Sequence, residues 1–386
     1  TDKSQTYFSY SYTNNSGIIP TASLKKNNIN FHQTTDFFNG RLKADLNVMY
    51  IHQSSHNRPV SGLYNNALTG LYQFPRGLDF DKYKNNYEVY SSVRNINVQN
   101  WWNANYDSSV IYPGSFTGGG QGTQQNPYWL LKQNFSSNIV NRVYSNFTFK
   151  FIINDWLNLQ ARGNVDKSVN DISYNSYATT SPTLTPFNGG YDFLRNINTQ
   201  LYGDLILNAN KKLSNNLGLQ ATLGSSVNDG QGLSNQFGTM IGGDGLRFAN
   251  LFTLANILPS NIVVNEGRSH SQMQAVFATA QLNLKDYIFM DVTGRNDWSS
   301  SFAFTPVETK GYFYYSLGIT GVLSDMFKMP TAVSFSKIRV SYAKVGNDVP
   351  SYATNPVLYY IDNQNGSRAN TKGPKPGTYL KPEDNR

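Results

Sequence analysis

The sequence predicts an all-β protein whose strands form an antiparallel transmembrane β-barrel segment. Apolar and polar residues alternate with a period of two over many stretches, which is the pattern of a strand with one apolar and one polar face. The connections between these stretches are short at one end of the strands and long at the other. A membrane barrel has this asymmetry, with tight turns on one side of the membrane and long loops on the other.

Composition is compatible with a barrel and excludes a helical membrane protein. Charged residues make up 15% and aromatic residues 14% of the 386 residues, and the mean hydropathy is −0.47. No stretch approaches the ~18 consecutive apolar residues of a membrane-spanning helix. A barrel strand needs only ~9–11 residues, half of them apolar, so its average hydropathy resembles that of a soluble protein.

Cysteine content and charge exclude further classes. The chain has no cysteine, which excludes disulfides, cysteine-based zinc clusters and thiol nucleophiles. The formal net charge is +8, but no basic run is longer than the pairs Lys25-Lys26 and Lys211-Lys212. Because binding of nucleic acid needs clustered basic residues, we expect a mildly basic surface and no nucleic-acid partner.

The first strand is expected at Tyr7–Tyr12, close to the beginning of the sequence. Residues 1–3 have neither the basic start nor the apolar core of a signal peptide. We therefore expect either that a signal peptide has been removed or that the chain begins inside a larger polypeptide.

A unit of strand, short turn, strand and long loop then recurs along the chain. Its clearest instance is 140–166, where two alternating arms flank a turn at Asn154-Asp155, which predicts a β-hairpin. The same pattern predicts strands at 40–52, at 199–226 with a turn at 211–215, at 274–295 with a turn at Lys285-Asp286, and at 311–345 with a wider connection at 323–336. About eleven strands follow from this pattern.

The connections give the expected orientation in a membrane. Turns near 36–39, 154–155, 211–215 and 285–286 contrast with long connections at 53–139, 167–198, 227–271, 296–310 and from 346 onward. Short periplasmic turns and long extracellular loops are typical of an outer-membrane barrel, and Tyr50, Trp156 and Tyr287 would lie in its aromatic girdles. A soluble β-sandwich, in which one strand face is buried, would show the same alternation and stays open as an alternative.

No catalytic or metal-binding motif is recognisable. The four histidines, His32, His52, His56 and His270, are spread too widely for a metal site or a catalytic triad. The glycine-rich run 118–122 lacks the Lys-Ser/Thr pair of a phosphate-binding loop. We therefore expect a protein that is not an enzyme and that carries no cofactor and no metal.

Aromatic residues in the long connection 53–139 are the candidate substrate-binding residues. They are Trp101, Trp102, Tyr106, Tyr128 and Trp129, in a stretch rich in Asn, Gly and Gln. Aromatic faces with amide groups nearby suit stacking against sugars or gripping peptides. The alternative is that these rings pack a small core of the loop itself.

Residues 285–302 form the most specific segment of the chain. An alternating strand that includes Ile288 and Val292 runs into the polar cluster 296–301, which we expect to be a loop. The stretches Gln281–Phe289 and Val292–Ser300 resemble the SusC/RagA family of TonB-dependent outer-membrane transporters. The stretch Ile338–Asp348 resembles the strand and Gly-Asn-Asp sequence of the same family, and weaker similarities occur at 14–20, 252–256 and 379–383.

The resemblance implies an architecture. Residues 1–386 would be a partial transmembrane β-barrel domain, about half of a barrel of the 22-stranded class, with the plug domain and the closing strands absent. An open half-barrel would expose unpaired strand edges to lipid, so we expect the chain to be part of a larger polypeptide.

The resemblance also implies a function. The protein would be a nutrient importer in the outer membrane of a Gram-negative cell of the Bacteroidetes type, energised by TonB through the plug. It would take up oligosaccharides or peptides together with a SusD-like surface lipoprotein. A passive porin or adhesin barrel, and a soluble sugar-binding β-sandwich, are the competing interpretations.

Seven residues of the two matching stretches are expected to have a structural role, with Arg295 and Asp297 pairing across strands and Trp298 acting as an anchor. These residues are Gly294, Arg295, Asp297, Trp298, Gly346, Asn347 and Asp348. The polar faces of other strands would line the plug or the transport path, with Arg41, Lys43, Asp45, Asn158, Gln160 and Arg162 as examples.

Overall fold

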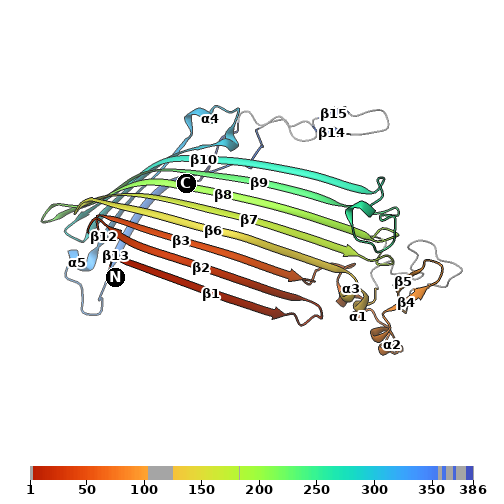
Figure 1. The fold of residues 1–386 in the computed structure, drawn as a ribbon. Helices are drawn as coiled ribbons and strands as arrows, with labels where there is room; N and C mark the ends of the chain where they lie inside the picture. Colours follow the sequence, from red (N-terminus) through yellow and green to blue (C-terminus); the bar gives the residue numbers. More distant parts are fainter. Residues whose placement is uncertain are drawn as a thin grey trace.

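A single large antiparallel sheet dominates the computed structural model, which describes residues 3–102, 125–181, 183–354, 359–361, 368–370 and 380–385. Figure 1 shows the sheet curling, so that β12 and β13 lie behind the first strands. In sheet order the strands are β1 (Ser4–Ser16), β2 (Ser23–Phe37), β3 (Leu42–His56), β6 (Phe135–Asn154), β7 (Leu157–Ser176), β8 (Gly190–Ser214), β9 (Leu217–Thr239), β10 (Ile262–Leu284), β11 (Ile288–Ser299), β12 (Tyr312–Val322), β13 (Lys337–Asn347) and β16 (Glu383–Asn385).

The remaining elements are short and lie in the connections. Between β3 and β6 come α1 (Ala67–Tyr72), α2 (Asp81–Asn85), the hairpin β4 (Glu88–Ser91) and β5 (Ile96–Gln99), and α3 (Pro127–Lys132). Later connections carry η1 (Leu254–Asn256), η2 (Ser300–Phe302), α4 (Val307–Lys310), α5 (Leu323–Met326), and the pair β14 (Tyr359–Ile361) and β15 (Arg368–Asn370). None of the described helices is long and apolar enough to cross a membrane.

Strand order follows chain order throughout the sheet. Apart from the small hairpin β4–β5, each long strand pairs with its sequence neighbour, and every pairing is antiparallel. The eleven-strand prediction is confirmed, with the three-residue β16 added at the edge. Because the described long strands form one sheet rather than two packed sheets, the β-sandwich alternative is wrong.

The predicted turns are confirmed with small shifts. Lys285 and Asp286 both have positive φ, +52° and +59°, as the two central residues of a tight type I′ hairpin require. The turn between β8 and β9 occupies only residues 215–216, and the turn between β6 and β7 lies one residue later than predicted, at 155–156. The turn predicted at 36–39 lies at 38–41, so Arg41 belongs to this turn and not to a polar strand face.

Several loops are shorter than predicted, because the strands continue into the ranges expected to be loops. Strand β8 has 25 residues, and β9 and β10 have 23 each, so much of 167–198 and 227–271 is strand rather than loop. These extensions carry polar residues on both faces, as in 234–236, Ser-Asn-Gln. Backbone pairing does not need an apolar face, whereas the alternation of hydropathy that reveals a strand in sequence does.

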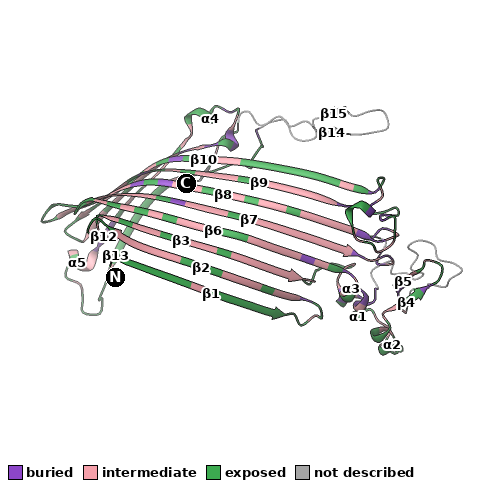
Figure 2. Cartoon of the chain, viewed as in Figure 1, coloured by how far each residue is buried: buried purple, intermediate pink, exposed green. Residues whose placement is uncertain are grey.

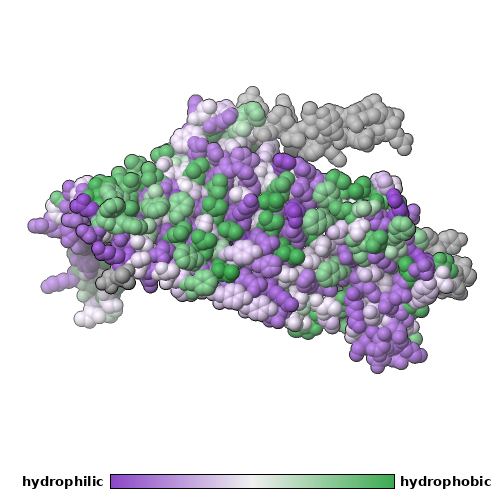
Figure 3. All heavy atoms as spheres, viewed as in Figure 1, coloured by the Kyte–Doolittle hydropathy of each residue, from purple (hydrophilic) through white to green (hydrophobic). Residues whose placement is uncertain are grey.

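The sheet has one apolar and one polar face over the part nearer the short turns. The outer face carries Leu46, Phe147, Leu205, Val276 and Val292, and the inner face carries Asn47, Thr148, Asp204, Thr279 and Thr293. The named outer-face side chains are 40–49% exposed although they are large and apolar. Figure 3 shows apolar side chains gathered over this part of the sheet. Such a face suits contact with hydrocarbon.

The sheet formed by the described residues is open. Strand β1 is exposed along nearly its whole length, and β13 is exposed at most positions (Figure 2). In a bilayer each unpaired backbone group at such an edge would cost several kcal/mol, roughly the penalty of burying an unsatisfied amide. A barrel that contains this wall therefore needs further strands at both edges.

Candidate functional site

Ion pairs tie neighbouring strands together on the inner face. Arg162 of β7 lies directly opposite Asp204 of β8, and its guanidinium donates to both carboxylate oxygens at 2.5–3.1 Å. The Asp204 side chain is fully buried and also accepts a hydrogen bond from the hydroxyl of Tyr202. Arg142 of β6 pairs with Asp166 of β7 in a more exposed position. Of the residues predicted to line the path, Arg162 thus has a defined role in holding the wall together.

A polar hollow of about 510 Å³ lies on the inner face beside Arg142 and Asp166. Its floor contains Gly230 and Gly232, and its walls carry hydroxyl and amide groups of Ser168, Asn170, Asn198, Gln200, Ser269 and Ser271. Amides and hydroxyls both donate and accept hydrogen bonds without a net charge. The hollow can therefore bind a polar, uncharged chain such as a peptide backbone or a saccharide.

The prediction of a loop over residues 296–301 is wrong for 296–299, because β11 runs to Ser299. Backbone pairing with β10 continues to this residue and draws the cluster into the sheet. Consecutive residues therefore point to opposite faces: Arg295 and Asp297 lie on the inner face, and Asn296 and Trp298 lie on the outer face. This alternation divides the matching stretch into two sets with different partners.

The inner set is an ionic cluster around the buried carboxylate of Asp297. Arg295 Nε donates to Asp297 Oδ1 at 2.7 Å along the same strand, so the expectation that these two residues pair across strands is wrong. The contact across strands is made instead by Tyr314 of β12, whose hydroxyl donates to the same carboxylate. The guanidinium also lies 5.5 Å from the centre of the Phe277 ring, within cation–π range. Sequence reasoning missed Tyr314, because its partner is known only once the register is known.

The two matching stretches meet at the end of β11. Ser299 Oγ donates to Asp348 Oδ2 at 2.6 Å, and Asn347 Nδ2 donates to Glu383 at 3.3 Å. The ring of Tyr312 lies against Gly346, where an added Cβ would be 3.2 Å from the ring. Asp348, in the loop after β13, therefore contacts the end of β11, and Gly346 of β13 packs against Tyr312 of β12, which fits a structural role for this set.

The outer set holds the connection between β11 and β12 against the sheet. The indole Nε1 of Trp298 donates to the carbonyl of Thr309 at 3.2 Å, and Asn296 Nδ2 donates to the carbonyl of Lys310 at 3.4 Å. Gly311, with φ +66°, follows, and a Cβ there would lie 2.5 Å from Asn296 Nδ2. Trp298 therefore anchors the connection to the sheet, through its hydrogen bond to the backbone of α4.

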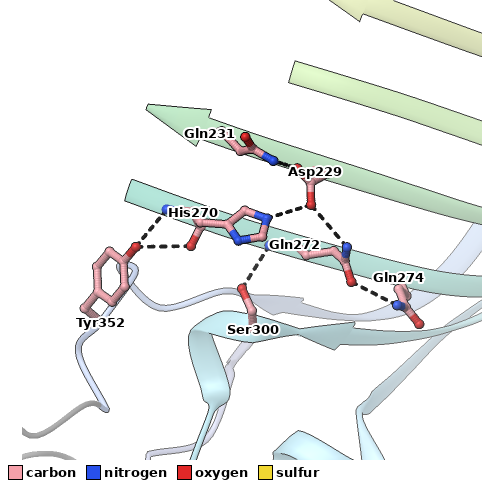
Figure 4. Close-up of polar contacts among 7 residues, drawn as sticks. All are labelled: Asp229, Gln231, His270, Gln272, Gln274, Ser300 and Tyr352. Atoms are coloured by element: carbon pink, nitrogen blue, oxygen red, sulfur yellow. Dashed lines mark hydrogen bonds and ion pairs between the residues drawn. The ribbon is translucent and has the colours of Figure 1, made fainter. Parts of the chain in front are cut away.

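A second polar network lies on the outer face of β9 and β10 (Figure 4). The carboxylate of Asp229 lies 2.7 Å from Nε2 of His270 and accepts hydrogen bonds at 3.1 Å from Gln272 and from Gln231. Gln272 in turn accepts from Gln274 at 3.0 Å. This network could not be predicted from the sequence, because its members are brought together only by the register of β9 against β10.

Side chains also replace strand pairing along the free edge of β10. Strand β11 begins to pair with β10 only at Met273, and beyond that point the backbone N–H of Gln272 donates to Ser300 Oγ at 2.9 Å. The hydroxyl of Tyr352 accepts from the N–H of His270 at 2.7 Å and donates to its carbonyl at 3.3 Å (Figure 4). Two loops thus satisfy the backbone where the neighbouring strand ends.

The structure separates the loop aromatics into buried and partly exposed rings. Trp129 is fully buried, and its indole N–H donates to Thr180 Oγ1 at 2.9 Å. Trp101 is 2% exposed and packs against the rings of Phe74, Phe80 and Tyr83. Neither ring has a surface for a cargo in this arrangement, because Trp101 belongs to the small core of the loop and Trp129 packs against Tyr177 and Thr180 of the next long connection.

Two of the other predicted aromatic residues have exposed surface that a cargo could reach. Trp102 and Tyr128 are partly exposed, and the ring of Tyr128 in α3 contacts the ring of Phe80 and the ammonium group of Lys132. Tyr106 lies outside the described residues. Substrate binding by Trp102 and Tyr128 therefore stays a prediction.

Buried amides connect this loop to the loop between β7 and β8. Gln99, Gln125 and Asn126 have no exposed surface. The side chain of Gln125 accepts from the N–H of Ser181 at 2.7 Å, and Gln99 donates to the carbonyl of Thr179 at 3.1 Å. Asn126 caps α3 by accepting from the N–H of Tyr128. Because these buried polar groups are paired, they join the described parts of the two loops into one platform at the long-loop end of the strands.

A half-buried carboxylate lies at the same end of the wall. Asp192 of β8 sits between Tyr174 of β7 and Gly238 of β9 and forms no ion pair with any described residue. Burial raises the pKa of Asp192 to about 6, against a smaller lowering effect of the backbone hydrogen bond from Thr239. Asp192 precedes Leu201 in β8 by nine residues, toward the long loops, and so lies outside the part of the sheet whose outer face is apolar. Among the described residues no cluster of His, Cys, Asp and Glu could hold a metal ion.

Solved structures with this fold were found by comparison. A chain of the RagAB peptide importer in the open-open state superposes with a TM-score of 0.73 at 14% identity, over 100% of this chain and 39% of that chain. The RagAB peptide transporter gives 0.74 at 14% identity, over 99% and 40%, and the closed-closed state gives 0.71 at 14%, over 96% and 38%. No protein-family model and no curated protein matches the sequence.

The comparison confirms the predicted fold. The chain is an all-β barrel segment with the fold of the corresponding part of the RagAB structures, and it spans about two fifths of the length of the chains it matches. At 14% identity the comparison shows a likeness of fold alone, and the roles of individual residues are inferred from their contacts in this structure.

Removal of Arg162 tests the ion pair of the inner face. In Arg162→Ala the fully buried Asp204 carboxylate loses its cation, and we expect the free energy of unfolding to fall by about 2–3 kcal/mol. The matched control is Arg142→Ala, whose partner Asp166 is 20% exposed, and it should cost less than about 1 kcal/mol. Urea unfolding of the full-length protein in lipid vesicles measures both. Equal losses would contradict the assigned difference in burial.

The carboxylate of Asp192 predicts a pH dependence. Its folded pKa of about 6 lies above its ordinary value of 3.8, so its contribution to stability is full below about pH 3.8 and is lost as the pH rises through about 6. Asp192→Asn should abolish this slope and raise stability at pH 7. Unfolding measured between pH 4 and pH 7.5 checks this, and an unchanged slope in the variant would show that another group titrates.

Proposed function

We propose that this chain is part of the barrel wall of an outer-membrane importer of the SusC type, energised through TonB. The observation that carries the proposal is the superposition of the whole chain on RagAB structures. The apolar outer face and the polar inner face support it, since a transporter wall must meet lipid on one side and a polar path on the other. Residues 1–386 would be a partial barrel domain, and the plug domain and closing strands would come from outside this chain.

The proposed cargo is a peptide, with an oligosaccharide as the alternative. The similar structures are those of RagAB, a peptide importer, which favours a peptide as the cargo. The inner polar hollow, with its amide and hydroxyl lining, supports both, because each cargo offers closely spaced donors and acceptors. We propose that the protein is not an enzyme and that it uses no cofactor of its own.

The proposed partners follow from the position of the ordered loops. A SusD-like surface lipoprotein would cover the long-loop end, where Gln99, Gln125 and Asn126 hold a rigid platform. Trp102 and Tyr128 would contact cargo there, positioned by the buried rings of Trp101 and Trp129. TonB would act on the plug and not on any residue of this chain. A Gram-negative cell of the Bacteroidetes type would be the host.

Uptake by cells tests the proposal. Cells that express the full-length transporter should take up fluorescent oligopeptides, and loss of TonB function should abolish this uptake. The double variant Trp102→Ala and Tyr128→Ala should lower uptake about 5- to 150-fold, which corresponds to two aromatic contacts of about 0.5–1.5 kcal/mol each. Tyr72→Ala, an aromatic of the same loop that is 84% exposed, is the matched control.

Each other outcome has a definite meaning. Uptake that persists without TonB would identify a passive porin and contradict the proposal. Uptake of oligosaccharides in place of peptides would keep the importer and change the cargo. Equal loss in the double variant and in the Tyr72 control would remove Trp102 and Tyr128 from the cargo contacts.

A further inference from the structure

A groove of about 1130 Å³ interrupts the apolar outer face between β8 and β12. Its floor consists of small side chains, and its walls consist of large apolar ones. The floor residues are Ala209, Ala221, Ala278, Ala280 and Gly294, and the wall residues include Leu207, Leu223, Val276, Phe313 and Leu317. The register places the floor residues side by side, because Ala221 pairs with Ala209 and Ala280, and Ala278 pairs with Gly294.

The dimensions of the groove match one leaflet of a bilayer. It follows β11 from Val292 to Trp298, a length of about 20 Å at the rise of an antiparallel strand. Half of a ~30 Å hydrocarbon core is about 15 Å, so an acyl chain from one leaflet would fill most of the groove. The Phe313 ring leans over the floor, since a Cβ on Gly294 would lie 3.2 Å from it. This contact narrows the groove to a channel for a thin, flexible occupant.

A cation stands at the end of the groove that lies nearer the long loops. Lys310 is exposed, lines the groove and forms no ion pair with a described residue. Its backbone carbonyl is held by Asn296, and the carbonyl of the preceding Thr309 is held by Trp298. The backbone that carries Lys310 is therefore held where the apolar floor gives way to polar residues, which in a bilayer corresponds to the boundary between hydrocarbon and headgroups.

Polar groups continue this headgroup zone along β9 and β10. Gln274 is the cross-strand neighbour of Trp298, and it is hydrogen-bonded to Gln272, which contacts Asp229 (Figure 4). A second, smaller hollow lies on the other side of Val276 and Trp298 and includes Leu205, Val227 and Gln274. The ridge formed by Val276 and Trp298 thus separates two apolar channels that share one polar rim.

We propose that this groove binds a phosphorylated lipid of the leaflet on the long-loop side, with an acyl chain along the alanine floor and the phosphate at Lys310. Charge complementarity selects the occupant, because an unpaired cation at the headgroup level attracts an anionic lipid in preference to a zwitterionic one. The paired channels suit a lipid with more than one chain. The inference rests on the membrane barrel fold and is independent of the cargo.

Lipid binding to the purified full-length transporter tests the proposal. Native mass spectrometry in detergent, with phosphatidylglycerol or with phosphatidylcholine of the same chains, should show tighter binding of the anionic lipid. Lys310→Gln should weaken phosphatidylglycerol binding about fivefold and phosphatidylcholine binding by clearly less, because the choline cation offsets the charge of the same phosphate. The matched control Lys25→Gln, an exposed lysine on the same face far from the groove, should change neither.

Filling the groove separates its shape from its charge. Ala278→Phe places a ring on the floor and should weaken both lipids at least fivefold, whereas Ala161→Phe, an outer-face alanine outside the groove, should weaken neither. All variants should show the heat-dependent gel migration of the folded barrel. Equal affinity for the two lipids, or no effect of Lys310→Gln, would overturn the proposal. A dimer that Ala278→Phe dissociates would overturn it too, by showing a second copy as the occupant.

Discussion

In a bilayer every backbone N–H and C=O must be paired within the protein, and the rest of this structure depends on that constraint. The register is continuous across the long strands except at Ile152/Asn154 and at Lys212/Ser214, and both of these irregularities lie at short turns. Where β11 ends beside β10, Tyr352 and Ser300 supply side-chain partners for the uncovered backbone. Continuous pairing in turn forces consecutive residues to opposite faces, and this separates the lipid-facing surface from the polar one.

The segment that resembles SusC/RagA transporters shows how one strand serves both faces. Arg295 and Asp297 form an inward cluster with Tyr314, while Asn296 and Trp298 hold the backbone of α4 from the outside. Ser299 then joins this strand to Asp348 of the second matching stretch. The two stretches are distant in sequence, and they act as one joint at the end of β11. This joint positions α4, which carries Lys310, and the loop after β13.

Sequence could predict the fold wherever the outer face is apolar, because hydropathy then alternates visibly. It predicted the strands around Lys285-Asp286 and the polar face at Asn158 and Gln160. It failed for the long extensions of β7 to β10, where polar residues occur on both faces and interrupt the alternation of hydropathy. It also could not distinguish the buried Trp101 and Trp129 from exposed rings, because burial depends on contacts with Thr180 and Phe80 that are far apart in the chain.

The central claim is that one face of this sheet lies in lipid, and spin-label accessibility along β9 tests it most directly. The absence of cysteine allows a single label at each position from Leu219 to Val227 without removing a native residue. In a bilayer, collision with oxygen should peak at Leu219, Ala221 and Leu223, and collision with a water-soluble nickel complex should peak at the residues between them. Accessibility without a period of two, or nickel contact at Ala221 and Leu223, would contradict the account.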